Sequence, residues 1–340
     1  MSKQRPTQSD VARLAGVSVA TVSYVVNQRR GGKVQVSDET RERVLRAVEE
    51  LCYQPNAAAR TLRTRRTQLL AVMVPDITNP FYPQLIRGAQ AAAEGRGYDI
   101  LVYDTGYRAA REHAFVAAML RRGADGVILV PFRLQAPDVA RLTQAGIEAV
   151  TVCSEGGDYG VDKVVPAERP AVHDVLCYLV SRGHRRIAHL SGSQDTPPGH
   201  LRLRGYREGL AAAGIPYDPS LVQCYSWSRS SVAEGIRALY GGTDGNEPTA
   251  VFAANDLMAI DAIRALTTLG RRVPEDVAVC GFDGIPEAEA IVPTLTTVDQ
   301  GAEAIGRRAA ELLLERLDTQ EPIPPREASI PCRMVLRESA

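Results

Sequence analysis

Apolar and polar residues alternate with the period of a helix through the first fifty residues. Three short helices are expected, and their apolar faces are Val11, Leu14 and Ala15; Val22, Val25 and Val26; and Val44, Leu45, Val48 and Leu51. The first helix begins at Thr7-Gln8-Ser9-Asp10, which has the form of a capping box, and ends at Gly16. Ser18 caps the second, Val19 to about Asn27, and Ser37-Asp38-Glu39-Thr40 opens the third. Two short helices joined by Gly16-Val17-Ser18 are typical of a helix-turn-helix.

In a helix-turn-helix, the first residues of the second helix face the base edges in the major groove of DNA. Here those residues are Val19 and Ala20, with Tyr24 one turn later. Apolar side chains there contact thymine methyl groups, but they cannot make a bidentate pair with guanine. Nearby hydroxyl side chains suit phosphate contacts, which fix position without reading sequence. These are Thr7, Thr21 and Ser23. The alternative is a small helical cap that binds nothing.

An alanine-rich stretch and then a basic stretch follow Tyr53-Gln54-Pro55-Asn56. Ala57–Arg63 favours a short helix because alanine has the highest helix propensity, but a helix of that length is marginal alone in water. A second copy of the chain, packed beside it on DNA, would stabilise it. The alternative is a plain basic linker that continues through Thr64-Arg65-Arg66-Thr67.

From Leu69 onward, apolar runs that predict strands alternate with stretches that predict helices. The first set is Leu69–Pro75, Phe81 to about Gly97, Asp99–Asp104, Ala109–Gly123, Gly126–Pro131, Pro137–Gly146 and Ala149–Cys153. The second set is Ile187–Gly192, a helix near Arg202–Gly214, Leu221–Tyr225, a helix near Ser230–Leu239, Ala250–Ala254, Asp256–Gly270 and Val277–Gly281. This alternation predicts two doubly wound parallel sheets. We expect the late helix Ala302–Leu317 to return to the first half, and the closing segment Ala328–Leu336 to belong to the second.

Open α/β sheets bind ligands beyond the carboxyl ends of their strands, and two such halves that face each other make a cleft that closes by hinging. The candidate ligand-binding residues follow those strand ends: Asp76, Asn79, Phe81, Arg202, Asn255 and Asp283. Carboxylate, amide and guanidinium groups suit a polyhydroxylated ligand, and aromatic rings cover its apolar faces. The alternative is that Asp256 caps a helix and Asp283 shapes a turn.

These residues carry a family resemblance. The stretch SDVARLAGVSVATVSYVVN, followed by VSDETRERVLRAVEELCYQPNAAARTLRTRRT, closely resembles the head and hinge of the lactose-repressor/galactose-repressor family. The match continues through almost the whole chain, where NDLMAIDAIRAL and GFD are near-diagnostic. The resemblance implies a DNA-binding regulator, expected to be a repressor, whose body resembles the periplasmic sugar-binding fold.

The resemblance also implies roles for particular residues. It places Val19, Ala20 and Tyr24 at base-reading positions and makes Ala57–Arg63 the hinge helix, in which Leu62 wedges between base pairs in the minor groove. The complete predicted DNA-binding set is Thr7, Val19, Ala20, Thr21, Ser23, Tyr24, Asn27, Asn56, Ala59, Arg60 and Leu62. In the body it assigns effector contacts to Arg202, Asn255 and Asp283.

Three segments depart from the family. Residues 28–35 form a longer link to the third helix, and its glycine pair and three positive charges predict a flexible basic loop near the DNA backbone. The strand Ala149–Cys153 ends in Cys-Ser-Glu where many members have a ligand-contacting aspartate. The next segment reads Val165-Pro166-Ala167-Glu168-Arg169-Pro170 in place of a typical Asp-Asn followed by Gly. The effector is therefore either a sugar in an altered pose or a different small molecule.

Charge and composition agree with this organisation. The 340 residues carry no net charge, but residues 1–66 contain 13 Lys and Arg against 6 Asp and Glu, and the remainder is correspondingly acidic. A basic head on an acidic body favours a polyanionic partner for the head alone. The six cysteines and five histidines show no metal-ligand spacing, so we expect free thiols and no metal. A cytoplasmic protein is the simplest interpretation, because neither a signal peptide nor an apolar run long enough to span a bilayer is evident.

The sequence contains no nucleophile elbow, P-loop or dinucleotide fingerprint, so neither catalysis nor a cofactor is expected. A sugar-metabolising enzyme and a transport-type binding protein are the alternatives. The predicted fold is α/β, with an all-α helix-turn-helix domain (1–55), a hinge (56–67) and an effector domain (68–340) of two doubly wound parallel-sheet subdomains. Their expected ranges are 68–166 with 299–326, and 167–298 with 327–340. A homodimer would place two heads on a pseudo-palindromic operator, under the control of a sugar-like effector.

Overall fold

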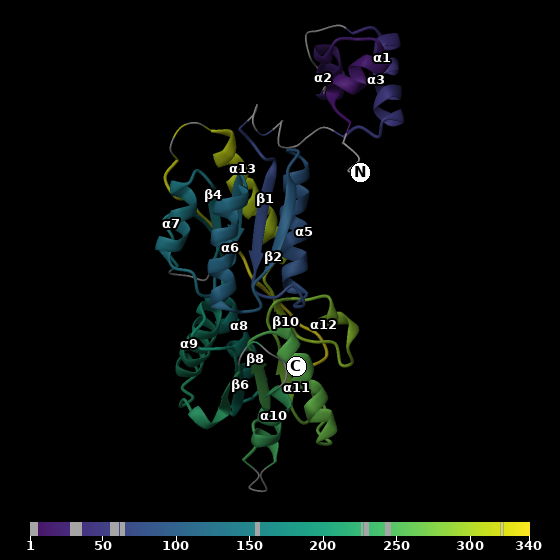
Figure 1. Cartoon of the computed structure of the whole chain (residues 1–340). Helices are drawn as coiled ribbons and strands as arrows, with labels where there is room; N and C mark the ends of the chain where they lie inside the picture. Colours follow the sequence, from purple (N-terminus) through teal and green to yellow (C-terminus); the bar gives the residue numbers. More distant parts are fainter. Residues whose placement is uncertain are drawn as a thin grey trace. The chain divides into compact units, whose positions relative to one another are not determined.

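The computed structural model (Figure 1) forms two compact units, Met1–Thr67 and Gln68–Ala340. It describes residues 6–27, 36–54, 61, 65–153, 157–225, 227, 231–241, 246–319, 321 and 323–340. The predicted DNA contacts Asn56, Ala59, Arg60 and Leu62 lie outside these residues, as does the basic loop 28–35. The side chain of Asn27 and most of the predicted hinge helix also lie outside them.

The three predicted helices of the head are present: α1 (Gln8–Ala15), α2 (Val19–Asn27) and α3 (Asp38–Glu50). Thr7 and Asp10 form the expected capping box, and Gly16 ends α1 in the left-handed conformation at φ 65°. The Ser37 side chain accepts a hydrogen bond from the Thr40 amide at the start of α3. Local capping chemistry therefore sets the limits of these helices.

A small apolar core joins the three helices of the head. Its fully or nearly buried members are Val11, Ala12, Ala15, Val22, Val25, Val44, Ala47 and Tyr53. The predicted apolar faces are wrong at two positions, since Leu14 is 47% exposed and Leu45 is 44% exposed. Leu14 precedes the buried Ala15, and Leu45 follows the buried Val44. Consecutive side chains point about 100° apart around a helix, so each of these leucines faces away from the core.

Among the described residues, no single helix is long and apolar enough to cross a membrane. The pair formed by Gln8–Ala15 and Val19–Val26 passes by length and composition when joined, but the two helices are bent by 105°. Their apolar side chains lie largely within the core of the head.

The body contains a six-stranded parallel sheet in the order β11-β5-β4-β3-β1-β2. Its strands are β1 (Leu69–Val74), β2 (Asp99–Asp104), β3 (Gly126–Leu129), β4 (Glu148–Val152), β5 (Asp162–Pro166) and β11 (Glu327–Ile330). Helices α5 (Phe81–Glu94) and α13 (Ala302–Asp318) cover one face, and α6 (Ala109–Arg122) and α7 (Ala136–Gln144) cover the other (Figure 1). Successive β1 residues face opposite layers, as a strand buried on both sides requires.

The cover formed by α5 and α13 depends on two glycines. A Cβ atom at Gly88 would lie 1.9 Å from the Glu303 carbonyl oxygen, and one at Gly306 would lie 1.8 Å from that of Leu85. Only residues without a side chain allow the two backbones to approach so closely. The predicted return of Ala302–Leu317 to the first half is therefore confirmed, and its packing is specific.

A second parallel sheet has the order β7-β6-β8-β9. Its strands are β6 (Ile187–Ser191), β7 (Val222–Cys224), β8 (Ala250–Ala253) and β9 (Ala278–Cys280), and the 3-10 turn η1 is Pro219–Leu221. Helices α8 (Glu168–Ser181) and α9 (Pro197–Ala212) cover one face, and α10 (Val232–Tyr240) and α11 (Asp256–Thr268) cover the other. The short helix α12 (Glu287–Ala290) and an antiparallel pair, β10 (Thr297–Asp299) and β12 (Arg333–Val335), complete this half.

The structure corrects the sequence prediction in this region. The pattern did not predict β5 or α8, and it placed Arg202 at the start of a helix that in fact begins at Pro197. The predicted assignment of 327–340 to the second subdomain is wrong for β11, which pairs with β5 at the edge of the first sheet. Lys163 and Glu327 form an ion pair of 2.9 Å across this edge, and such long-range pairing leaves no local pattern in the sequence.

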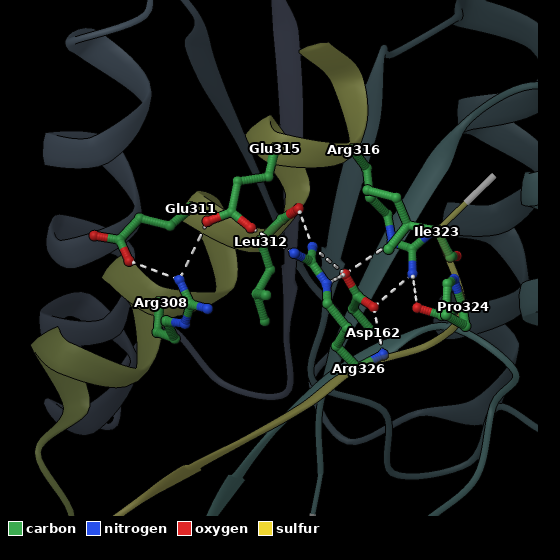
Figure 2. A network of polar contacts seen from close by, with 9 residues as sticks. All are labelled: Asp162, Arg308, Glu311, Leu312, Glu315, Arg316, Ile323, Pro324 and Arg326. Atoms are coloured by element: carbon green, nitrogen blue, oxygen red, sulfur yellow. Dashed lines mark hydrogen bonds and ion pairs between the residues drawn. The ribbon is translucent and has the colours of Figure 1, made fainter. Parts of the chain in front are cut away.

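A buried carboxylate fixes the chain segment that leads into β11 (Figure 2). The fully buried side chain of Asp162 accepts hydrogen bonds from Arg316 at 2.6 and 2.8 Å, and from the Arg326 side chain and amide at 2.7 to 3.2 Å. Burial alone would raise the pKa of Asp162, but the bonds from Arg316 and Arg326 outweigh it and hold the pKa below its usual value. One carboxylate thus joins β5, α13 and the start of β11.

We predict that Asp162→Asn lowers the free energy of unfolding in urea by roughly 3 kcal/mol, because it removes the carboxylate that pairs with the largely buried Arg316 and leaves Arg326 paired with Glu315 alone. The matched control is Asp318→Asn, which breaks the ion pair of Asp318 with Arg96, where both side chains are more than half exposed. The control should lose less than about 1 kcal/mol. Equal losses in the two variants would contradict the role given to Asp162.

Candidate functional site

The start of α2 presents a solvent-facing surface on the head. Val19 is 44% exposed and Ala20 is also exposed, whereas Thr21, Ser23 and Tyr24 are half-buried. The Ser18 hydroxyl accepts a hydrogen bond from the Thr21 amide at 3.1 Å, which fixes the first turn of the helix. The N-terminal face of α2 is therefore available to a partner, as base reading by a helix-turn-helix requires.

Thr7 has a structural role in addition to its predicted phosphate contact. Its hydroxyl donates to Asp10 Oδ2 at 2.8 Å, and its amide donates to the same oxygen at 3.0 Å. The residue is exposed, so the capping arrangement leaves its side chain at the surface of the head.

A cavity lies between the two subdomains of the body, beside the carboxyl ends of their strands. Its walls are Asn79, Phe81, Tyr82, Tyr107, Val130, Pro131, Phe132, Val152, Cys153, Pro166, Glu168, Pro197, Pro198, Arg202, Trp227, Asn255, Asp283 and Gln300. Five of the six predicted effector residues are among them. The sixth, Asp76, is not among them; its Oδ1 accepts hydrogen bonds from the Thr78 amide at 2.9 Å and the Thr78 hydroxyl at 2.6 Å.

Arg202 is the buried cation of this cavity, at 4% exposure. Its guanidinium forms two hydrogen bonds with Glu168, Nε to Oε2 at 3.3 Å and Nη2 to Oε1 at 3.1 Å. Nη1 donates to the Ala254 carbonyl and lies 3.5 Å from Asp283 Oδ1. The guanidinium also lies over the Phe282 ring, 4.1 Å from its centroid. Most of its donors are thus engaged within the protein, as a buried charge requires.

Asp283 occupies an unusual position in this arrangement. Its backbone has φ 127°, a conformation that residues with side chains rarely adopt, and its Oδ1 accepts a hydrogen bond from Gln300 Nε2 at 2.7 Å. Burial raises the pKa of Asp283 to about 7. The positive charge of Arg202 lowers this pKa, whereas the nearby carboxylates of Asp256 and Glu168 raise it further. A strained, poorly compensated carboxyl group at a cavity wall is typical of a binding residue.

Neighbouring side chains support the loop that carries Asp283. Asp256 Oδ2 accepts hydrogen bonds from the amides of Gly284 at 2.8 Å and Ile285 at 2.9 Å, and its Oδ1 accepts one from the Thr297 hydroxyl. The helix cap is Asn255, whose Oδ1 accepts from the Met258 amide at 2.8 Å. The alternative reading of Asp256 as the cap of α11 is therefore wrong, because this carboxylate holds the loop after β9.

Aromatic rings from both subdomains form another wall of the cavity. The centroids of Tyr107 and Phe132 are 5.6 Å apart, and those of Phe132 and Trp227 are 6.0 Å apart. Phe132 follows β3 in the first subdomain, whereas Trp227 follows β7 in the second. Such rings suit the apolar faces of a sugar-sized ligand.

Sequence reasoning missed two of these features. Glu168 stands in the segment whose departure from the family was noted, but the residue was not selected because its partner Arg202 is 34 positions away. Trp227 was not selected either, although it is the single tryptophan of the chain. The same departing segments supply Cys153 and Pro166 to the cavity wall.

Known proteins share this organisation. A family described as bacterial regulatory proteins, lacI family, matches residues 7–56, and a periplasmic binding protein-like domain matches residues 176–340. The chain is 40% identical over 339 residues to the HTH-type transcriptional regulator CelR of Thermobifida fusca, covering 94% of this chain and 95% of that one. It is 32% identical to the ribose operon repressor of Escherichia coli K12, with 92% and 93% covered. The chain belongs to the lacI family.

Solved structures of lacI-family proteins resemble the whole chain. A complex of CelR with cellobiose has a TM-score of 0.72 at 36% identity and covers 99% of this chain and 100% of that one. A lac repressor dimer bound to operator and the anti-inducer ONPF has a TM-score of 0.84 at 28% identity, with 99% of each chain covered. This lacI-family member is therefore a DNA-binding transcriptional regulator with a ligand-binding body.

The raised pKa of Asp283 predicts a pH-dependent stability in this regulator. An ordinary aspartate has a pKa of 3.8 and Asp283 one of about 7, so its ionisation destabilises the fold progressively as pH rises between these values. Asp283→Asn should therefore stabilise the ligand-free protein more at about pH 8 than at about pH 5, on the order of 1.4 kcal/mol for each pKa unit. Urea unfolding at both pH values measures this difference.

Asp276→Asn is the control for this experiment. Asp276 has a pKa lowered to about 2 by hydrogen bonds from the Arg272 side chain and amide, so it is ionised at both pH values. The control should show no gain as pH rises. A gain equal to that of Asp283→Asn would contradict a specific penalty at Asp283.

Proposed function

We propose that the chain is an effector-controlled, operator-binding regulator, and that the cavity between its subdomains is the effector site. The observation that carries this proposal is the composition of the cavity wall. Both subdomains contribute to it, and it combines the polar groups of Asn79, Arg202, Asn255 and Asp283 with the rings of Phe132 and Trp227. In this proposal the chain acts by binding, without catalysis.

The effector that this wall suits best is a neutral carbohydrate. Glu168 occupies much of the guanidinium of Arg202, and Asp283 adds a second acidic group, so acidic groups outnumber cations around Arg202. Hydroxyl groups donate to such carboxylates, whereas a phosphate or uronate would be repelled. The CelR structure with cellobiose and a related structure with bound ribose support the same class of ligand.

The departures from the family bear on how a sugar would lie. The strand that ends at Cys153 lacks the usual aspartate, the segment that contains Pro166 lacks the usual Asp-Asn pair, and both Cys153 and Pro166 line the cavity. Neither donates or accepts as strongly as the groups replaced. Hydroxyl recognition therefore falls chiefly on Asn79, Asn255 and Asp283 in this proposal, and Asp76 contributes only by shaping its turn.

We further propose that a homodimer binds a pseudo-palindromic operator through residues 1–55 and a hinge at 56–67, because the similar lac repressor is a dimer on its operator. Val19, Ala20 and Tyr24 would read bases, and Leu62 would wedge into the minor groove. The other proposed contacts are Thr7, Thr21, Ser23, Asn27, Asn56, Ala59 and Arg60. Ligand-driven reorientation of the first subdomain would change hinge pairing, and the coupling must be reciprocal.

Selection of tight binders from a random pool of duplex DNA tests whether the chain binds a specific operator sequence. Recovery of an inverted repeat is the expected result. Binding without any shared sequence, which disappears as salt rises, would leave only attraction to phosphate and contradict the proposal.

We predict that Val19→Glu weakens binding to the selected operator at least about tenfold, because the new carboxylate faces base edges and phosphates. The matched control is Leu45→Glu, which adds the same charge to the head at a residue of equal exposure, 44%, on α3. The control should change affinity less than about threefold, since its long-range repulsion is screened. Fluorescence anisotropy with labelled operator measures both, and equal losses would contradict base reading by α2.

A panel of sugars tests the effector class. Cellobiose, ribose and glucose represent neutral ligands, and glucose 6-phosphate and glucuronate represent anionic ones. We expect a neutral sugar to change both Trp227 fluorescence and operator affinity, and its anionic counterpart to bind at least about tenfold more weakly. Tighter binding of an anionic sugar would show that Arg202 exchanges Glu168 for the ligand, and would overturn this assignment.

A further inference from the structure

Two loops from opposite subdomains meet at the rim of the cavity. Arg133 follows the lining residue Phe132, and Asp195 precedes the lining residue Pro197 by two positions. Arg133 Nη2 lies 2.6 Å from Asp195 Oδ2, and Nη1 donates to the Asp195 carbonyl oxygen at 3.1 Å. Two bonds thus cross directly from the first subdomain to the second.

We propose that Arg133 and Asp195 form a latch that holds the subdomains closed and positions Phe132 and Trp227 against each other at the ligand site. This inference rests on the proposed effector site. Arg133 and Asp195 are positioning residues, since neither lines the cavity.

The arginine side of the latch is rigidly built. Glu112 of α6 is fully buried, and its carboxylate accepts hydrogen bonds from three successive amides: Phe132 at 3.2 Å, Arg133 at 3.0 Å and Leu134 at 2.9 Å. Phe132 and Leu134 are themselves buried. The backbone of Arg133 is therefore fixed by the first subdomain alone, and only its side chain reaches across.

The aspartate side connects directly to the tryptophan. The Ser193 hydroxyl donates a hydrogen bond to Asp195 Oδ1. The Ser193 carbonyl oxygen accepts a hydrogen bond from the Thr196 hydroxyl at 2.6 Å. Trp227 Nε1 in turn donates to Thr196 Oγ1 at 3.0 Å. The bonds from Ser193 and then Arg133 hold the pKa of Asp195 below its usual value, so its carboxylate is ionised near neutral pH. The position of Asp195 is thereby tied to the indole ring.

Exposure makes the latch reversible. The side chains of Arg133 and Asp195 are 31% and 59% exposed, whereas those of Arg202 and Glu168 are 5% and 6% exposed. A partly exposed pair is weakened by salt, but a buried pair is screened much less. Because each side of the latch is fixed within its own subdomain, breaking it opens the cleft without unfolding either half. The latch therefore biases an equilibrium between open and closed forms.

Trp227 reports on that equilibrium, because it is the single tryptophan and only 9% exposed between the subdomains. The experiment uses the full chain without DNA or effector, and measures acrylamide quenching and the emission maximum. Arg133→Ala and Asp195→Asn should each raise the open population roughly 1.5- to 5-fold. Quenching should increase accordingly, and the emission maximum should move to longer wavelength.

Salt provides a second readout. Wild-type quenching should rise between about 0.01 M and about 1 M salt, where the Debye length falls from ~30 Å to ~3 Å, and this rise should be absent in Arg133→Ala. The exchanged pair Arg133→Asp with Asp195→Arg should recover part of the protection. Arg272→Ala, which breaks the exposed pair of Arg272 with Asp276 on the second subdomain, should behave like wild type.

Quenching that is unchanged in Arg133→Ala would overturn the latch. So would increased quenching that comes with a lowered Tm and no recovery on charge exchange, because that result indicates a merely structural role. Neither measurement depends on the identity of the effector or on operator binding. The latch can therefore fail while the proposed function stands, and the sugar panel can fail while the latch stands.

Discussion

A permanently charged guanidinium group buried between strand ends must be compensated, and the architecture of the cavity follows from this requirement at Arg202. Its partners come from the start of α8, the end of β8 and the loop after β9. All three elements belong to the second subdomain, so the hydrogen bonds of Arg202 connect three separate segments into one wall of the cavity. Burial of the charge is tolerable only because these acceptors are fixed before any ligand arrives.

The same requirement leaves Asp283 in an unfavourable place. Glu168 takes the larger share of the guanidinium, and Asp283 retains a positive φ and a raised pKa. Asp256 holds the loop in this conformation through two backbone amides and Thr297. Backbone strain of this kind concentrates at binding and active sites, where the surrounding structure holds it in place.

Each subdomain is stabilised by packing contacts of its own. In the first, the contact of Gly88 and Gly306 lets α13 lie against α5, and Asp162 joins β5 to the returning chain. In the second, alternate strand residues pack against α8 and α9 on one face and α10 and α11 on the other. Each half therefore has a core of its own, and the latch that we propose at the cleft rim would act on the orientation of one half relative to the other.

The amino-acid sequence by itself determined the features that depend on neighbours along the chain. Capping at Thr7 and Ser37, the turn at Gly16 and the alternation of strands and helices follow from local hydrogen bonding and periodicity, and the structure confirms them. Strand-end positions were equally readable, because parallel strands expose their carboxyl ends on one edge. Asn79, Arg202, Asn255 and Asp283 follow such strand ends in the sequence, and the structure places all four at the cavity wall.

The tertiary structure alone decided which of these groups pair. Arg202 is 34 positions from Glu168 and 81 from Asp283, and β11 joins a strand formed more than 160 residues earlier. Sequence periodicity carries no information about pairs so far apart in the chain, so it missed Glu168 and misplaced β11. Whether a strand-end carboxylate faces the cavity or its own turn depends on where the backbone bends after the strand. That bend is set by packing between segments far apart in the chain.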